Sequence, residues 1–131
     1  MFKRIILSLL FVLLIGNLSA QEKGISFFHG SWEEAITKAK VENKLIFIDF
    51  YTKWCGPCKT MADEVFVTKQ TGDFYNKNFI SVKIDAETAI GAPIAKNYNV
   101  SVYPTFVFVD PQTLEMVHYS TGRQEEDIFL L

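Results

Sequence analysis

The chain has 131 residues, of which 49% are hydrophobic, 13 are Lys or Arg and 15 are Asp or Glu. This length fits one compact domain and is too short for two sizeable cores. The net charge of −2 supplies no basic surface, so no nucleic-acid partner is expected.

The first twenty residues, MFKRIILSLLFVLLIGNLSA, are typical of a secretory signal peptide. Lys3 and Arg4 precede an apolar stretch over residues 5–15, and the small pair Ser19-Ala20 follows. We expect cleavage near Ala20, which leaves residues 21–131 as the mature domain. Retention as a membrane anchor is the alternative, although this stretch, at about 1.5 Å per helical residue, spans only about half of a roughly 30 Å hydrocarbon core.

Export would change the charge and the expected anchoring of the chain. Removing Lys3 and Arg4 lowers the basic count by two, from 13 to 11, against 15 acidic residues. Gln21 stands where a bacterial lipoprotein needs a cysteine, so lipid anchoring is not expected. Disulfides persist outside the cytosol, which matters for the cysteines described below.

The mature chain begins with a short predicted strand and a capped helix. Residues 24–28, GISFF, are expected to form the strand. Ser31 and Glu34 have the spacing of a capping box, in which each side chain bonds the backbone N–H of the other residue. The helix that they open is expected to end near Asn43.

A buried strand leads directly to the segment that carries the cysteines. Residues 45–51, LIFIDFY, form an apolar run without polar alternation, which is typical of a strand buried on both faces. Asp49 is the one charged residue in that run. Pro57 is well placed to start the next helix, whose apolar residues repeat at helical spacing as far as Val65.

The second half of the chain alternates helix and strand and ends with a hairpin. A mixed sheet flanked by helices, an α/β fold, is therefore expected. The last helix has run only about two turns when the sequence ends, so we expect it to be incomplete. The elements predicted here are a helical turn over 73–78, a strand over 79–84, a helix from Pro93, antiparallel strands over 105–109 and 114–119, and a last helix from Gln124.

The chain has only two cysteines, Cys55 and Cys58, in the sequence WCGPCK. A purely structural disulfide across so small a loop would contribute little stability. A metal site needs three or four ligands, and the histidines, His29 and His118, lack zinc-like spacing to the cysteines, so no metal is expected. Lys59 stands where attachment of a c-type haem requires histidine.

Redox chemistry suits the position of this pair. Cys55 would lie at the start of a helix, where the dipole and the free N–H groups stabilise a thiolate. Cys58, one turn further in, is expected to be more buried and less ionised, which suits the attack that resolves a mixed disulfide with the substrate. The residues therefore predict thiol:disulfide exchange.

The sequence WCGPCK at 54–59, after the strand IFIDFY and before YPT at 103–105, resembles the thioredoxin family. The resemblance covers about residues 31–131 and implies a thioredoxin-like fold. Within the family, the segments AITKAKVENKLIFIDFY and EVFVTKQTGDFYNKNFISVKID are closer to exported bacterial thiol:disulfide oxidoreductases. This likeness implies the bacterial periplasm as the location.

The resemblance also implies a role for each residue of the site. Cys55 would be the nucleophile, Cys58 the resolving thiol and Asp49 the buried carboxylate behind Cys58. Because Asp49 lies in a buried strand, we expect desolvation to raise its pKa. The implied substrate-binding residues are Trp54, Gly56, Pro57, Tyr103 and Pro104, with a cis bond between Tyr103 and Pro104 and backbone hydrogen bonds from Tyr103 to the substrate.

Several residues depart from the family pattern. Tyr51 stands where tryptophan is common, and Lys53 places a cation before the site tryptophan. Ser81 stands where thioredoxins usually have a lysine beside the buried carboxylate, and Lys83, on the same face of its strand, is the candidate substitute. Asp49 is alternatively a structural charge paired with a lysine.

The expected function is the reduction of disulfides in other exported, cysteine-containing proteins, because Gly56-Pro57 resembles the pair found in reducing thioredoxins. Reduction outside the cytosol implies a membrane-embedded electron donor, and no cofactor is implied. A disulfide oxidase or isomerase is the alternative direction. A non-catalytic module that binds peptides near Pro104, or that handles copper through its two thiols, is the alternative of another class.

Overall fold

A computed structural model of the chain describes residues 23–131. The predicted signal segment, residues 1–20, lies outside the described residues, so its cleavage and its alternative role as an anchor stay predictions. No helix within residues 23–131 is both long and apolar enough to cross a membrane.

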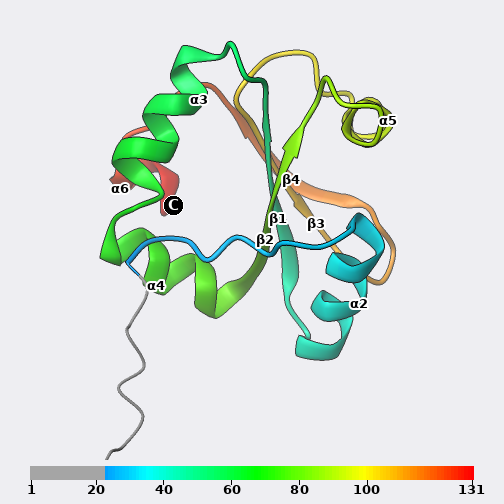
Figure 1. Cartoon of the computed structure of the whole chain (residues 1–131). Coiled ribbons are helices and arrows are strands. Elements are labelled where there is room, and N and C mark those ends of the chain that lie inside the picture. Colours follow the sequence, from blue (N-terminus) through cyan, green and yellow to red (C-terminus); the bar gives the residue numbers. More distant parts are fainter. Residues whose placement is uncertain (1–22) are drawn as a thin grey trace, which may run out of the picture.

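The described residues form a four-stranded mixed sheet with helices on both faces (Figure 1). β1 pairs in parallel with β2 and antiparallel with β3, and β3 pairs antiparallel with β4. The predicted α/β architecture is confirmed. The strands are β1 (Leu45–Tyr51), β2 (Phe79–Asp85), β3 (Thr105–Val109) and β4 (Met116–Thr121), in the spatial order β2-β1-β3-β4.

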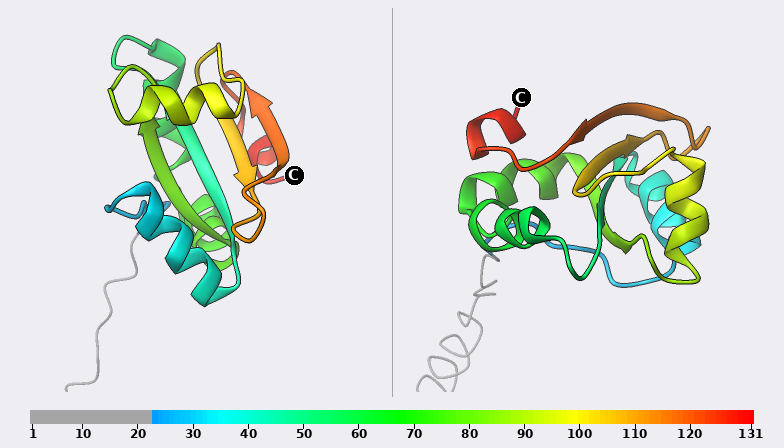
Figure 2. Two further views of the ribbon diagram at one scale, coloured as in Figure 1. Left: turned by 90° about the vertical axis from the view of Figure 1, so that its right-hand side faces the viewer. Right: turned by 90° about the horizontal axis from the view of Figure 1, so that it is seen from above.

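Two groups of helices cover the sheet (Figure 2). One face carries α2 and α5, and the other carries α3, α4 and α6 with a π-helical stretch, η1, that continues α3. The bounds are α2 (Trp32–Glu42), α3 (Gly56–Thr60), η1 (Met61–Val65), α4 (Lys69–Asn78), α5 (Gly91–Asn97) and α6 (Glu126–Phe129).

The capping box predicted for α2 is present. The N–H of Glu34 donates to Oγ of Ser31 at 3.1 Å, and the N–H of Ser31 donates to Oε2 of Glu34 at 2.7 Å. The helix ends at Asn43, whose φ of 50° lies in the left-handed region that Asn tolerates. Both ends of α2 are therefore where the sequence placed them.

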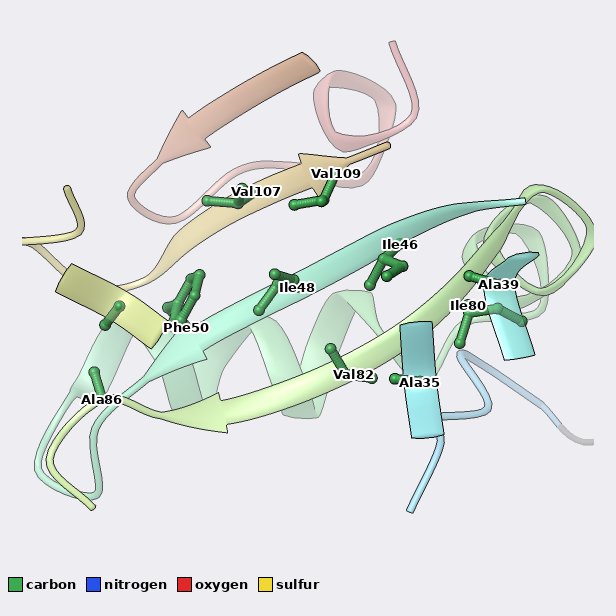
Figure 3. Packing of buried hydrophobic residues seen from close by; sticks show 11 residues of the cluster. Ala35, Ala39, Ile46, Ile48, Phe50, Ile80, Val82, Ala86, Val107 and Val109 are labelled. Atoms are coloured by element: carbon green, nitrogen blue, oxygen red, sulfur yellow. The ribbon is translucent and has the colours of Figure 1, made fainter. Parts of the chain in front are cut away.

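Hydrophobic clusters fill both sides of the sheet and meet at β1. Ile46, Ile48 and Phe50 point to one side and pack with residues of α2 and α5 (Figure 3). Phe47 points to the other side and packs with η1, α4 and α6. Since β1 buries both of its faces, its sequence shows no polar alternation.

The predicted strand over residues 24–28 is wrong. This segment makes only one isolated parallel bridge, between Phe27 and Ser81 of β2. The N–H of Ile25 donates instead to the carbonyl of Phe66, in the loop after η1, at 2.7 Å. Because that donor is used outside the sheet, the pairing with β2 does not extend into a ladder.

Other elements start at positions that differ from the predictions. α4 begins at Lys69, earlier than residue 73, because Oγ1 of Thr68 accepts from the N–H of Thr71 and caps the helix. β4 begins at Met116, two residues late, because Leu114 has a φ of 61° and cannot continue a strand. α5 begins at Gly91 and α6 at Glu126, each two residues from the predicted start.

Candidate active site

Cys55 and Cys58 form a disulfide at the point where α3 follows the central strand β1. Cys55 is the N-cap of α3, and the two Cα atoms are 5.3 Å apart. The N–H of Cys58 donates to Sγ of Cys55 at 3.1 Å. A helix-start N–H directed at this sulfur would stabilise a thiolate on Cys55 after reduction.

Burial does not distinguish the two cysteines in this disulfide form. Each is 6% exposed. The prediction that Cys58 is the more buried is therefore wrong for the oxidised protein, since the covalent bond holds both sulfurs at a similar depth. The two cysteines differ instead in hydrogen bonding, because the N–H of Cys58 donates to the sulfur of Cys55.

Asp49 is only 1% exposed in the middle of β1. Nζ of Lys83, its cross-strand neighbour on β2, lies 3.4 Å from Oδ2 and forms an ion pair without a close hydrogen bond. Burial raises the pKa of Asp49 to about 6, because desolvation outweighs the opposing effect of Lys83. The predicted rise is confirmed, and a carboxylate with this pKa is suited to accept a proton near neutral pH.

Lys83 takes the place of the lysine that is missing at Ser81. Its Nζ lies 5.3 Å from the ring centre of Phe27, 5.0 Å from that of Tyr51 and 5.6 Å from that of Phe66. These separations fall within the range of cation–π attraction, so the rings help to hold the ammonium in place. Ser81 itself is buried, and its hydroxyl has no hydrogen-bond partner in the described part of the chain.

Trp54, which directly precedes Cys55, lies next to the loop before β3. Trp54 is 69% exposed, and its ring meets that of Tyr103 edge to face with centroids 6.1 Å apart. The bond between Tyr103 and Pro104 is cis, as predicted. The structure thus brings together the WCGPC segment and the distant YPT segment, although their roles in substrate binding stay predictions.

Glu87 is a site residue that the sequence analysis missed. Its Oε1 accepts the indole N–H of Trp54 at 2.8 Å. Glu87 follows the end of β2, which is parallel to β1, and the carboxyl ends of parallel neighbours meet at one edge of a sheet. This topology was the signal that could have placed Glu87 near the cysteines.

The disulfide borders a hollow of about 160 Å³. Cofactor and drug-sized ligand sites usually exceed about 300 Å³, so this hollow has room for little more than one side chain. A larger apolar groove of about 550 Å³ lies at α4, β4 and α6 and contains neither cysteine. The hollow is lined by Tyr51, Thr52, Lys53, Cys55, Cys58, Lys59, Ala62 and Lys83.

Histidines are absent from the lining of this hollow. His29 and His118 are both exposed and far from the cysteines in sequence. Within residues 23–131, no group of three or more His, Cys, Asp and Glu side chains is arranged to hold a metal ion. The reactive groups of the described site are its two cysteines, and Asp49 is linked to them through Lys83, which pairs with Asp49 and lines the same hollow.

Comparison with protein families shows that residues 25–130 match the thioredoxin family model. The chain belongs to the thioredoxin family. Thioredoxin H4 of Arabidopsis thaliana is 33% identical over 97 residues, which cover 74% of this chain and 76% of that protein. As a member of the thioredoxin family with a disulfide in its CXXC motif, this protein is a thiol:disulfide oxidoreductase, so the predicted enzyme class is confirmed.

Solved structures of other thioredoxin-like proteins share this fold. The solution structure of a Bacteroides thetaiotaomicron protein named as a disulphide-isomerase is 37% identical, with a TM-score of 0.73, and the match covers 82% of this chain and 88% of that protein. The crystal structure of thioredoxin f2 in complex with ferredoxin:thioredoxin reductase matches with a TM-score of 0.60 over 83% of this chain and 92% of that one. At 24% identity, this second match supports the fold alone.

Proposed function

We propose that this protein is exported after cleavage near Ala20 and reduces disulfides of other exported proteins. The observation that carries the proposal is a WCGPC motif in a thioredoxin-family chain whose first twenty residues have the pattern of a secretory signal. The Gly56-Pro57 pair between the cysteines resembles that of reducing thioredoxins and favours reduction over oxidation.

In the proposed reaction, the thiolate of Cys55 attacks one sulfur of a substrate disulfide. The substrate S–S bond breaks, a mixed disulfide with Cys55 forms, and the other substrate sulfur leaves as a thiolate. Cys58 then loses its proton and attacks Sγ of Cys55, which forms the Cys55–Cys58 disulfide and releases the second substrate thiolate. Two electrons pass from the enzyme dithiol to the substrate, whose two thiolates take up protons.

The site geometry supports separate roles around this reaction. We propose that Asp49, whose pKa is about 6, accepts the proton of Cys58 as that thiol attacks. Its ion-pair partner Lys83 lines the same hollow as Cys58, which supports this role. The ring of Trp54, which directly precedes Cys55 in the chain, meets that of Tyr103 in the cis Tyr103–Pro104 loop, and we propose that an extended substrate segment binds there. The hydrogen bond from the indole N–H to Glu87 also restrains Trp54.

Each turnover leaves the enzyme oxidised, so a second partner must return two electrons. Thioredoxin f2, a protein of the same fold, was solved in complex with ferredoxin:thioredoxin reductase. Because export would separate this protein from cytosolic reductants, we propose a membrane-embedded dithiol protein as its electron donor.

Equilibration of the mature protein with glutathione buffers tests the direction. A reductase should have a reduction potential near thioredoxin's value of about −270 mV. A potential near about −120 mV, typical of a strong oxidant, would overturn the proposed direction. Sequencing of the N-terminus from an exporting cell tests the location, with Gln21 expected as the first residue.

A disulfide isomerase is the second candidate, favoured by the 37% identity to the Bacteroides protein. Isomerisation requires the enzyme to reshuffle a wrongly paired substrate and leave it oxidised. Recovery of activity from scrambled ribonuclease in the absence of a reducing system would support this candidate, and release of free thiols only when a reductant is supplied would support the reductase.

A further inference from the structure

The hollow beside the disulfide has an unbalanced set of charged residues. Lys53, Lys59 and Lys83 line it together with both cysteines, and no Asp or Glu lines it. A concave surface lined by charges of one sign attracts a partner of the opposite sign. Carboxylates of the protein itself neutralise part of this positive charge.

Two of the three lysines have a carboxylate partner. Nζ of Lys59 lies 2.6 Å from Oδ2 of Asp63, one turn further along the helical segment, and Lys83 pairs with Asp49. Lys53 is exposed and makes no ion pair with any residue of 23–131. The unmatched positive charge of the hollow is therefore that of Lys53, directly before Trp54.

Thr52 also lines this hollow. Its Oγ1 is buried, and the described residues supply no hydrogen-bond partner for it. The ammonium groups of the hollow are hydrogen-bond donors only, and a carboxylate, which has only acceptor atoms, is the complementary side-chain group. The limited volume of about 160 Å³ suits one such side chain.

We propose that this hollow receives the carboxylate of an acidic residue close to the reacting cysteine of the substrate, and that Lys53 is the residue that determines this preference. The inference deepens the proposed function and rests on it, because both cysteines of the disulfide line the hollow in which the carboxylate would bind. Charge pairs of this exposed kind mainly raise the rate of association, and salt screens them.

Reduction rates of matched peptides test the inference. Two disulfide peptides that differ only in Glu or Gln, two positions from the attacked cysteine, are reduced by the reduced mature protein. We expect the Glu peptide to react about three- to tenfold faster at an ionic strength of about 0.02 M, and the ratio to approach one at about 0.5 M. Equal rates at low salt would overturn the inference.

Two substitutions at Lys53 and one matched control locate the effect. Lys53→Gln should bring the ratio of the two rates close to one, and Lys53→Glu should reverse the preference. Lys40→Gln, which removes an exposed lysine of α2 far from the hollow, should keep the wild-type ratio. Circular dichroism verifies that each variant is folded.

The outcomes separate the inference from the function on which it rests. A wild-type ratio in Lys53→Gln would overturn the role of Lys53 while leaving the reductase proposal intact, because the peptides would still be reduced. Failure of the wild-type protein to reduce either peptide would contradict the proposed function, and the inference would fall with it.

Discussion

Asp49 illustrates how the surroundings of one residue set its chemistry. Its pKa rises from 3.8 to about 6 because burial disfavours the charged form more than Lys83 stabilises it. Since the folded-state pKa is the higher one, protonation stabilises the fold. That stabilisation is complete below about pH 4 and is lost as the pH rises through about 6.

Replacing Asp49 by Asn is therefore expected to act in a pH-dependent way. Relative to the parent, the stability of Asp49→Asn should rise by roughly 2–3 kcal/mol between about pH 4 and pH 7.5, because only the parent carries an ionising buried carboxylate. Urea unfolding at both pH values measures this difference. Asp63→Asn, which changes an exposed carboxylate, is the control. A difference that does not change with pH would show that Asp49 ionises equally well in the unfolded and folded chain.

The roles of the two cysteines also belong to the residue scale, because their equal burial does not assign them. We expect Cys58→Ser to form mixed disulfides that accumulate, since Cys55 attacks the substrate but no second thiol releases it. Non-reducing gels of cells that express the variant would show these species, and a reductant would remove them. Cys55→Ser should trap far less, and equal trapping by both variants would contradict the assignment.

At the scale of elements, α6 is held to the domain by polar contacts as well as by packing. The hydroxyl of Tyr75, on α4, donates to the carbonyl of Phe129 at 3.0 Å, and the two rings stack with centroids 4.6 Å apart. The hydroxyls of Thr68 and Thr71 both donate to Oε1 of Glu126. Burial raises the pKa of Tyr75 well above its usual value, so its hydroxyl stays protonated and remains a donor.

Tyr75→Phe removes that hydrogen bond while it keeps the ring. The variant should lose about 1 kcal/mol of unfolding free energy, typical of one buried hydrogen bond. Amide hydrogen exchange at Phe129 and Leu130 should become faster, because α6 detaches more often. Tyr119→Phe, on the exposed side of β4, is the control and should change stability by less than about 0.5 kcal/mol. Unchanged exchange in α6 would show that ring stacking alone holds the helix.

The elements that were predicted correctly from the sequence are those with a complete local signal. The capping box at Ser31 and the uninterrupted apolar run of β1 each specify an element without reference to distant residues. The segment over 24–28 was predicted incorrectly because its pairing depends on where the carbonyl of Phe66 lies. The local sequence pattern of residues 24–28 carries no information about the position of that carbonyl.

The same distinction applies to the candidate site. The cysteines were evident from four consecutive residues, and the cis bond before Pro104 followed from the family resemblance. The contact of Trp54 with Glu87 depends on how the loops after β1 and β2 are placed, which no local motif encodes. The contacts that were not predicted from the sequence are thus those between residues that only the tertiary structure brings together.

For the whole molecule, the segment before α2 closes one edge of the sheet. It runs from α4 across the molecule to α2 and is drawn in blue in Figure 1. β2 is the outer strand on that side, and Phe27 bridges to it while its ring packs against those of Phe47 and Phe66. An open strand edge pairs readily with other chains, so this cover protects against association.

Removal of residues 23–30 from a chain that otherwise spans 23–131 should therefore lower the melting temperature and promote aggregation. The cause is the loss of the hydrogen bonds from Ile25 and Phe28 together with the packing of Phe27. Calorimetry and light scattering on chains 23–131 and 31–131 measure the two effects. Equal midpoints and equal scattering would show that β2 is stable without this cover.

Because the chain has only two cysteines and both are in the disulfide, the redox state of the protein has a simple stoichiometry. An alkylating mass tag adds two labels to the dithiol and none to the disulfide. A single label identifies a molecule in which one sulfur is occupied, as in a mixed disulfide with a partner. Electrophoretic mobility after tagging therefore gives the number of free thiols in each molecule. It reports the redox state directly in a cell extract and without a reference protein.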